Sequence, residues 1–231
     1  MTAKQLIKYM VSVPKSLYFN LRVLPFSQAV KLPIVVAYNV KLQKIQKGII
    51  SFKEGVRLKP VTVAIGFNGT EEVSPQRALI NLCGGNLIFG GKCNFAEGCI
   101  IGVSGGTLTF GANFSANKNF FVSCNKEILF GDDCMLGWNV LLFDATGHII
   151  YKDGIQKSSF SPIHIGNHVW LCAEVHVMKG ASISDGSVVG YRSLLTGTFE
   201  ESNILVAGNP AKLVQRGIPW GHFEKSKVNN E

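Results

Sequence analysis

The chain has few charged residues, no long apolar run and no acidic residue in its first 48 positions. Only 16% of its 231 residues are charged, whereas 46% are hydrophobic, so it is able to bury a sizeable core. No apolar stretch approaches the roughly 20 residues that a membrane-spanning helix needs, and we see no signal peptide. We therefore expect a cytoplasmic protein.

Paired cysteine motifs are also absent. None of the six cysteines stands in a C-x-x-C arrangement. That spacing is typical of zinc sites and thiol–disulfide catalysts. We interpret the cysteines as reduced thiols of a cytosolic protein, and we expect no disulfide and no bound metal.

Positive charge is in excess, with a formal net charge of +8 at pH 7. Such a charge suits an anionic partner. It is accompanied by no nucleic-acid recognition motif and no array of aromatic and basic side chains, so we expect no nucleic-acid partner. An anionic cofactor or an anionic membrane surface accounts for the charge equally well.

Aliphatic residues recur every six positions in the C-terminal half of the chain. They are Ile165, Leu171, Val177, Ile183, Val189 and Leu195. Two positions before each stands an aliphatic or small residue, from Ile163 to Ser193. Neither a helix nor a simple strand produces a period of six, whereas a chain that turns a corner every six residues does. The spacing therefore predicts a parallel β-helix in which three short strands make one triangular coil.

The same period recurs upstream, between Leu87 and Leu142, with a shift of phase at Gly105 and Gly106. The repeats fall in groups of three, as three faces of a coil require, and Cys93, Cys99 and Cys134 occupy core positions. Glycine often follows the aliphatic position, which we interpret as a corner with unusual backbone angles. We expect this solenoid over residues 49–200, followed by a C-terminal extension over 201–231.

Residues 1–48 form a separate basic segment with eight Lys and Arg residues and no Asp or Glu. Pro14, Pro25 and Pro33 are expected to divide it into short pieces. We favour a short helical or irregular cap in which apolar side chains cover the open end of the solenoid. Peripheral contact with an anionic membrane, at the inner face of the cell membrane, is compatible with that cap.

One long insertion, residues 143–162, interrupts the repeats and contains a single histidine, His148. Loops on a rigid scaffold often carry function. A neutral imidazole accepts a proton from a sugar hydroxyl or a thiol, so His148 is a candidate general base. Most loop histidines are simply solvated, but this one stands in an insertion that interrupts a regular solenoid. Asp144 either orients His148 or caps its own turn, and we favour the turn.

Three motifs follow one another in a set order: Thr146–His148, Ile165–Trp170 and Ala207–Lys212. Over about residues 85–216 the chain resembles the hexapeptide-repeat acyltransferases, and in particular the galactoside and maltose acetyltransferase type. The segment from Tyr18 to Ile34 is similar to the start of capsular-polysaccharide O-acetyltransferases.

The resemblance implies a left-handed β-helix, a homotrimer, and acetyl-CoA bound in grooves between neighbouring subunits. It places the catalytic base at His148. It also suggests acceptor contacts at Asn117 and at Asn125, where the family often has an acidic residue, and we group Asp144 with these two. The implied acetyl-CoA contacts are Trp170, Ala173, Tyr191, Thr196 and Lys212.

Two departures from the family pattern stand in this region. Leu171 and Cys172 replace a usual Ile-Gly pair, and Tyr191 and Arg192 replace a small pair, so that Tyr191 narrows the groove for the pantetheine arm. We interpret the chain as an acetyl-CoA-dependent O-acetyltransferase that acts on a sugar hydroxyl in surface-polysaccharide biosynthesis. The alternatives are an amino-sugar N-acetyltransferase of the same fold and a non-catalytic carbohydrate-binding trimer.

The other histidines of the solenoid have simpler interpretations. His164 and His176 are twelve residues apart, whereas a coil takes about eighteen. They should therefore lie on different faces and do not converge within one coil. A zinc site with His168, with ligands from two subunits as in a β-helix carbonic anhydrase, is the less favoured alternative.

Overall fold

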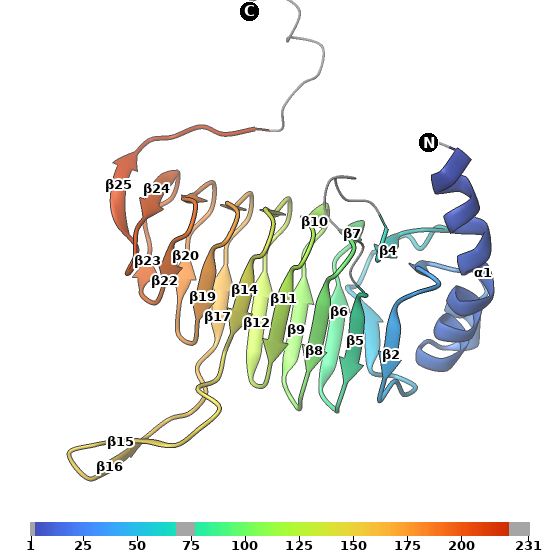
Figure 1. Ribbon diagram of the computed structural model, residues 1–231, viewed down its shortest axis with the longest axis horizontal. Coiled ribbons are helices and arrows are strands. Elements are labelled where there is room, and N and C mark those ends of the chain that lie inside the picture. Colours follow the sequence, from blue (N-terminus) through green and yellow to red (C-terminus); the bar gives the residue numbers. More distant parts are fainter. Residues whose placement is uncertain (1–2, 68–76, 222–231) are drawn as a thin grey trace, which may run out of the picture.

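The computed structural model describes residues 3–67 and 77–221, with side chains from residue 5 onward. Three parallel sheets wind along one axis (Figure 1), and the chain visits them in turn. This is the left-handed parallel β-helix that the six-residue period and the family resemblance predicted. Of the helices in these residues, none combines the length and the apolarity needed to cross a membrane.

The three sheets are named A, B and C here. Sheet A consists of β1 (Ile34–Val36), β4 (Val63–Ile65), β7 (Cys93–Phe95), β10 (Phe114–Ala116), β13 (Met135–Leu136), β18 (Trp170–Leu171), β21 (Val188–Val189), β24 (Ile204–Ala207) and β25 (Lys212–Arg216). Sheet B consists of β2 (Lys41–Gln43), β5 (Leu79–Leu82), β8 (Ile100–Val103), β11 (Phe121–Cys124), β14 (Leu141–Phe143), β19 (His176–Met178) and β22 (Leu194–Leu195). Sheet C consists of β3 (Ile50–Phe52), β6 (Asn86–Phe89), β9 (Thr107–Phe110), β12 (Glu127–Phe130), β17 (Ile163–Ile165), β20 (Ser182–Ile183) and β23 (Thr198–Phe199).

Phenylalanine fills the middle of the solenoid. Side chains alternate between inside and outside along a strand, and each inward position stacks on its equivalent in the next coil. Six phenyl groups meet in this way, and their neighbouring ring centroids lie 4.5–6.4 Å apart. They belong to Phe89, Phe95, Phe110, Phe114, Phe120 and Phe130, all at most 1% exposed.

The glycines that follow the aliphatic positions have a different role from the one expected. Gly90, Gly111 and Gly131 do not have positive φ angles, so the interpretation as unusual corner angles is wrong. The left-handed angles fall two residues later, on Asn113 and Asp133, with φ of 56° and 59°. Asn and Asp tolerate that conformation better than most residues. The glycines are needed because successive coils approach closely: a Cβ on Gly111 would lie 2.1 Å from the Gly131 carbonyl oxygen.

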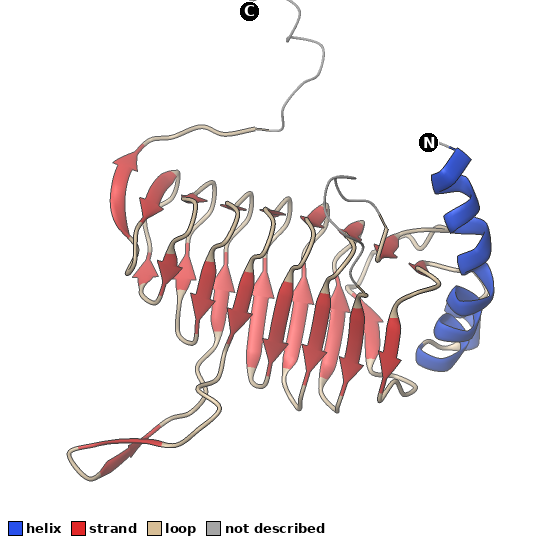
Figure 2. Cartoon of the chain, viewed as in Figure 1, coloured by secondary structure: helices blue, strands red, loops and turns tan. Residues whose placement is uncertain are grey.

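A long helix covers the first coil. Helix α1 (Ala3–Val23) continues through Pro14, and α2 (Phe26–Ala29) follows it, so the expectation that Pro14 divides this segment is wrong. Figure 2 shows both helices confined to one end of the solenoid. The predicted helical cap is confirmed, although contacts on both sides of Pro14 keep α1 in one piece.

Polar side chains of α1 pair with the open edge of sheet A. The Ser16 hydroxyl accepts from Val36 N–H at 3.0 Å and donates to Ser12 and Val36 carbonyls. The Asn20 amide bonds both the N–H (3.2 Å) and the C=O (2.6 Å) of Ile34. An edge strand otherwise leaves these groups unpaired. The cap therefore works in two ways: these buried polar groups pair the strand edge, and Phe19 and Val23, both fully buried in the core, provide the apolar cover that we expected.

The solenoid begins earlier and ends later than the sequence suggested. Strands β1 and β2 already lie in sheets A and B, within residues 1–48, and β24 extends sheet A beyond residue 200. The first coils were missed because their six-residue pattern is irregular. At the far end β25 turns back and pairs antiparallel with β24. Residues 222–231 of the expected C-terminal extension lie outside the described residues.

The close approach of the coils at Gly111 yields a first test. Gly111→Ala should lower the free energy of unfolding by about 1–3 kcal/mol, because the added methyl group forces two backbones apart. Gly197→Ala is the matched control, since a Cβ there meets nothing within 4 Å and its φ is not positive. Urea denaturation followed by circular dichroism measures both. Equal effects of the two substitutions would contradict the close-approach explanation.

Candidate active site

The insertion leaves the solenoid between β14 and β17, at the corner between sheets B and C. It carries the antiparallel hairpin β15 (Ile150–Lys152) and β16 (Ile155–Lys157), which projects away from the coils (Figure 1). At its base Thr146 N–H donates to the Ser159 carbonyl at 2.9 Å, and Ser161 N–H donates to the Asp144 carbonyl at 3.0 Å. The predicted insertion is therefore a structured arm.

Asp144 anchors this arm. Its side chain is fully buried, and its carboxylate accepts from the N–H groups of Asn125, Lys126 and Glu127 at 2.6–3.0 Å. These groups belong to the preceding coil, so the prediction that Asp144 caps its own turn is wrong. With its oxygens occupied and no exposed surface, the carboxylate has no route to direct contact with an acceptor. Charge-assisted bonds of this kind are the strong ones, and they fix the point where the arm begins.

His148 lies on the arm with its imidazole exposed to solvent. Its backbone carbonyl accepts from the Thr146 hydroxyl at 2.8 Å and from the Ser159 hydroxyl at 3.5 Å. Within the described residues, the ring has no hydrogen-bond partner, and none joins it to Asp144. The backbone is held while both ring nitrogens remain available to a substrate.

The other residues predicted for the site fall on two corners of the triangular coil. Asn125 and Thr196 follow sheet B, on the same corner as the arm, and the Asn125 amide lies 3.3 Å from Asp144. Asn117, Ala173 and Tyr191 follow sheet A, at the corner between sheets A and B. Sheet B separates these two corners. One chain therefore does not bring His148 together with Asn117, Ala173 or Tyr191.

Several proteins named as O-acetyltransferases are similar in sequence to this chain. A galactoside O-acetyltransferase of Escherichia coli (strain K12) is 30% identical over 165 residues, which cover 69% of this chain and 78% of that protein. The chain belongs to the hexapeptide-repeat O-acetyltransferases. The family resemblance drawn from the three ordered motifs is thereby confirmed.

Further comparisons extend the list of similar proteins. A polysialic acid O-acetyltransferase of Escherichia coli O1:K1 / APEC is 31% identical over 135 residues, or 57% of this chain and 44% of that protein. The crystal structure of the polySia-specific acetyltransferase NeuO shares 23% identity at a TM-score of 0.44, over 85% of this chain and 92% of that one. No model of a protein family matches the chain.

In this acetyltransferase a cleft of about 500 Å³ runs beside the corner of Ala173 and Tyr191, lined by Asn139, Glu174, His176, Arg192, Ser193, Leu194 and Asn209. Arg192 Nε donates to Glu174 Oε2 at 2.7 Å, and the Tyr191 hydroxyl donates to Glu174 Oε1 at 3.2 Å. Sequence reasoning missed Glu174. It stands 18 residues before Arg192, one coil away, so the coil period itself was the signal that pairs them.

The remaining cofactor candidates lie on sheet A. Trp170 faces outward from β18, and Lys212 is exposed at the start of β25, paired with Ala207. As predicted, His164 and His176 lie on different sheets. Among residues 3–67 and 77–221, no three His, Cys, Asp or Glu side chains group as a metal site.

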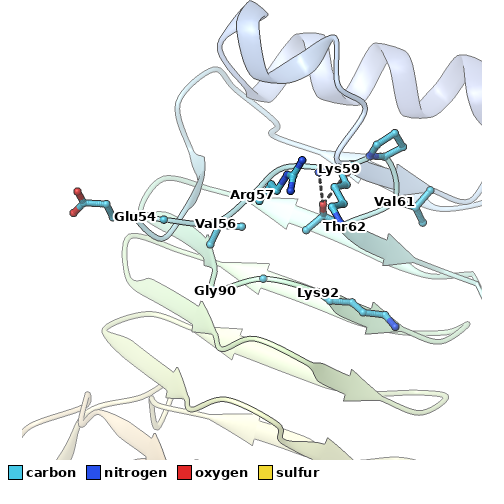
Figure 3. A pocket seen from close by; sticks show the side chains of 11 residues that line it. Glu54, Val56, Arg57, Lys59, Val61, Thr62, Gly90 and Lys92 are labelled. Carbon is cyan, nitrogen blue, oxygen red and sulfur yellow. Dashed lines mark hydrogen bonds between the residues drawn. The ribbon is translucent and has the colours of Figure 1, made fainter.

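A second cleft, of about 620 Å³, lies between the first coils, at the α1 end of the solenoid (Figure 3). Its lining includes the exposed basic side chains Arg57, Lys59 and Lys92 and one acidic side chain, Glu54. No residue predicted for the acetyl-transfer site lines it.

The C-terminal segment returns over Trp170 and forms a strap there. The Trp220 ring stacks on His168 at 4.0 Å between centroids, and its Nε1 donates to the His168 carbonyl at 3.0 Å. The His168 ring bonds the Asp133 carboxylate at 2.6 Å and the Trp220 carbonyl at 3.1 Å. The Trp220 ring lies 6.0 Å from that of Trp170. The strap thus borders a residue expected to contact the cofactor.

His168 makes the strap sensitive to pH. Burial alone would lower the pKa of His168, but its hydrogen bonds to Asp133 and Trp220 and the Asp133 charge outweigh burial and raise that pKa. Because the docked state binds the proton of His168 more tightly, protonation stabilises the docked strap. This stabilisation is complete when the pH is below the ordinary histidine pKa of about 6.5. This stabilisation is lost as the pH rises through the raised pKa. The strap should therefore loosen on the alkaline side.

A fluorescence titration measures this loosening. Tryptophan emission, with Trp220→Phe as the blank, should change with a midpoint above the ordinary histidine value. Asp133→Asn should move that midpoint to lower pH, because it removes the charge that holds the proton. Glu127→Gln is the matched control, since it alters the other close histidine–carboxylate pair, His164 with Glu127 at 2.6 Å. A midpoint that stays in place in Asp133→Asn would refute the assignment.

Proposed function

We propose that this protein transfers an acetyl group from acetyl-CoA to a sugar hydroxyl in surface-polysaccharide biosynthesis. The relatives named above act on galactosides and on polysialic acid, as their names state. The observation that carries the proposal is His148 on the arm between β14 and β17: its backbone is held, and its exposed imidazole has no hydrogen-bond partner among the described residues. We also propose a cytoplasmic location, at the inner face of the membrane.

In the proposed mechanism His148 acts as a general base. Its neutral ring takes the proton of the sugar hydroxyl while the hydroxyl oxygen attacks the thioester carbonyl carbon. A backbone N–H near Ala173 stabilises the oxyanion of the tetrahedral intermediate. That intermediate collapses with cleavage of the carbon–sulfur bond, and the imidazolium returns the proton to the departing thiolate. The ester and free CoA are the products.

The site is proposed to form between subunits of a homotrimer. His148 stands at one edge of sheet B, and Ala173 and Tyr191 stand at the other. Three subunits that turn sheet B toward a common axis bring one edge against the opposite edge of the neighbour. The outward face of sheet B supports this packing, because one of its rows is largely apolar. Leu79, Ile100, Phe121, Leu141 and Leu194 stand in this row, with Lys41 at its start and His176 between Leu141 and Leu194.

The remaining residues have proposed roles within that groove. Trp170 packs on the pantetheine arm, Tyr191 and Thr196 flank it, and Lys212 meets the phosphates of CoA. Asn117 and Asn125 contact the acceptor. Tyr191 is more than half exposed and is bulkier than the residue usual for the family. We therefore propose that it shapes this groove differently.

Removal of the base is the main test. His148→Ala should lower kcat by 10²–10⁴-fold, the typical cost of losing a general base. Acceptor-dependent release of CoA from acetyl-CoA, screened over a panel of sugars, measures the rate. His164→Ala is the matched control and should retain most of the activity. Light scattering confirms that both variants keep the mass of the wild type. A kcat above a tenth of the wild-type value in His148→Ala would mean that another group is the base.

Lys212 tests the donor side. Lys212→Ala should raise the KM for acetyl-CoA and leave kcat and the acceptor KM nearly unchanged. A charge on remote phosphates binds the ground state and the transition state equally, which gives this pattern. The same steady-state assay, with each substrate varied in turn, separates the two constants. A change confined to the acceptor KM would place the CoA groove elsewhere.

A further inference from the structure

Helix α1 departs from the usual arrangement of a surface helix, which turns its apolar side toward the core and its polar side toward water. Its inner side is mixed: Phe19 and Val23 are buried in the core, and Ser12, Ser16 and Asn20 are buried and bonded to β1 and to Tyr38 N–H just after it. The outer side, which is polar in most surface helices, carries large apolar side chains.

The outer side of α1 is almost wholly apolar. Eight large apolar side chains are 44–64% exposed there: Leu6, Ile7, Met10, Val11, Val13, Leu17, Tyr18 and Leu21. At 3.6 residues per turn these positions occupy one continuous face of about half the circumference. Phe26 on α2 and Val30 after it extend the surface at 72% and 54% exposure. An apolar cleft of about 230 Å³ opens along the same helix, between Met10, Val13 and Val61.

The charge around this face is mainly positive, although Glu97 pairs with Lys8 of α1 and Glu54 lines the neighbouring cleft. Residues 1–48 contain eight Lys and Arg residues and no Asp or Glu, and Arg22 and Lys31 are exposed. The basic cleft of Arg57, Lys59 and Lys92 lies below the same helix (Figure 3). A second copy of this face would bring like charges together, whereas an anionic lipid surface complements both the apolar and the basic parts.

We propose that the α1 end of the protein docks on an anionic lipid bilayer. The outer face of α1 enters the boundary between headgroups and acyl chains, and Arg22 and Lys31 contact the headgroups. Because α1 lies across the end of the solenoid (Figure 1), its outer face points away from the coils. The solenoid then stands on the membrane. Four steps of about 4.8 Å separate β2 from β14, so the His148 arm leaves the solenoid about 20 Å from its first coil, on the far side of that coil from α1.

Sedimentation with vesicles tests the docking. The full chain should partition at least about ten-fold better onto equimolar phosphatidylcholine–phosphatidylglycerol vesicles than onto phosphatidylcholine alone. The double variant Met10→Glu and Tyr18→Glu should lose at least about ten-fold of the anionic binding, because both side chains lie on the apolar face. Val214→Glu is the matched control: Val214 is 60% exposed on β25, at the far end of the solenoid.

A second variant separates charge from apolar contact and does not depend on the first. Arg22→Glu with Lys31→Glu leaves the apolar face intact and should reduce binding to the anionic vesicles alone. Thermal unfolding should be unchanged in both variants, because the buried bonds of Ser16 and Asn20 are not altered. Equal partition onto both vesicle types would overturn the proposal. So would light scattering in which Met10→Glu with Tyr18→Glu halves the mass of the wild type, since a second copy would then cover the face.

Discussion

The parallel backbone ladder that joins each coil to the next is the constraint on which the rest of this protein depends. Strands of neighbouring coils lie about 4.8 Å apart in all three sheets, so equivalent residues stack in columns. The phenyl groups of the core form columns of this kind, because each inward position stacks on its equivalent in the next coil. Gly111 and Gly131 form another column, at a corner where the backbones of successive coils leave no space for a methyl group. Where the insertion interrupts the ladder, the carboxylate of Asp144 replaces the missing backbone acceptors. It accepts hydrogen bonds from three N–H groups of the preceding coil.

A ladder of this kind necessarily ends in unpaired backbone groups at both ends, and the chain satisfies them differently. At the first coil Ser16 and Asn20 act in place of a neighbouring strand. At the last coil β25 turns back and pairs with β24. The first solution places Ser12, Ser16 and Asn20 beneath α1 beside the buried Phe19 and Val23. Positions that face the core are thus used for polar groups, while further large apolar side chains lie on the outer face.

The same ladder explains why the residues proposed for acetyl transfer are spread over the surface. The column keeps each residue on its own corner, and sheet B separates His148 from Ala173 within one chain. The proposed mechanism therefore requires two chains to pack against each other. The anchoring at Asp144 gives the arm a defined starting point, although His148, the proposed base, is exposed to solvent.

The six-residue period by itself determined the fold, because only a coil with three faces repeats in that way. The ordered set of three motifs, Thr146–His148, Ile165–Trp170 and Ala207–Lys212, indicated the family, and the break in the repeat located the arm. The tertiary structure alone decided the bond partners of Asp144, the role of the corner glycines and the orientation of α1. These depend on contacts one coil apart or between a helix and a sheet edge. The residues concerned are 14–20 or more positions apart, and local sequence patterns do not specify which of them meet.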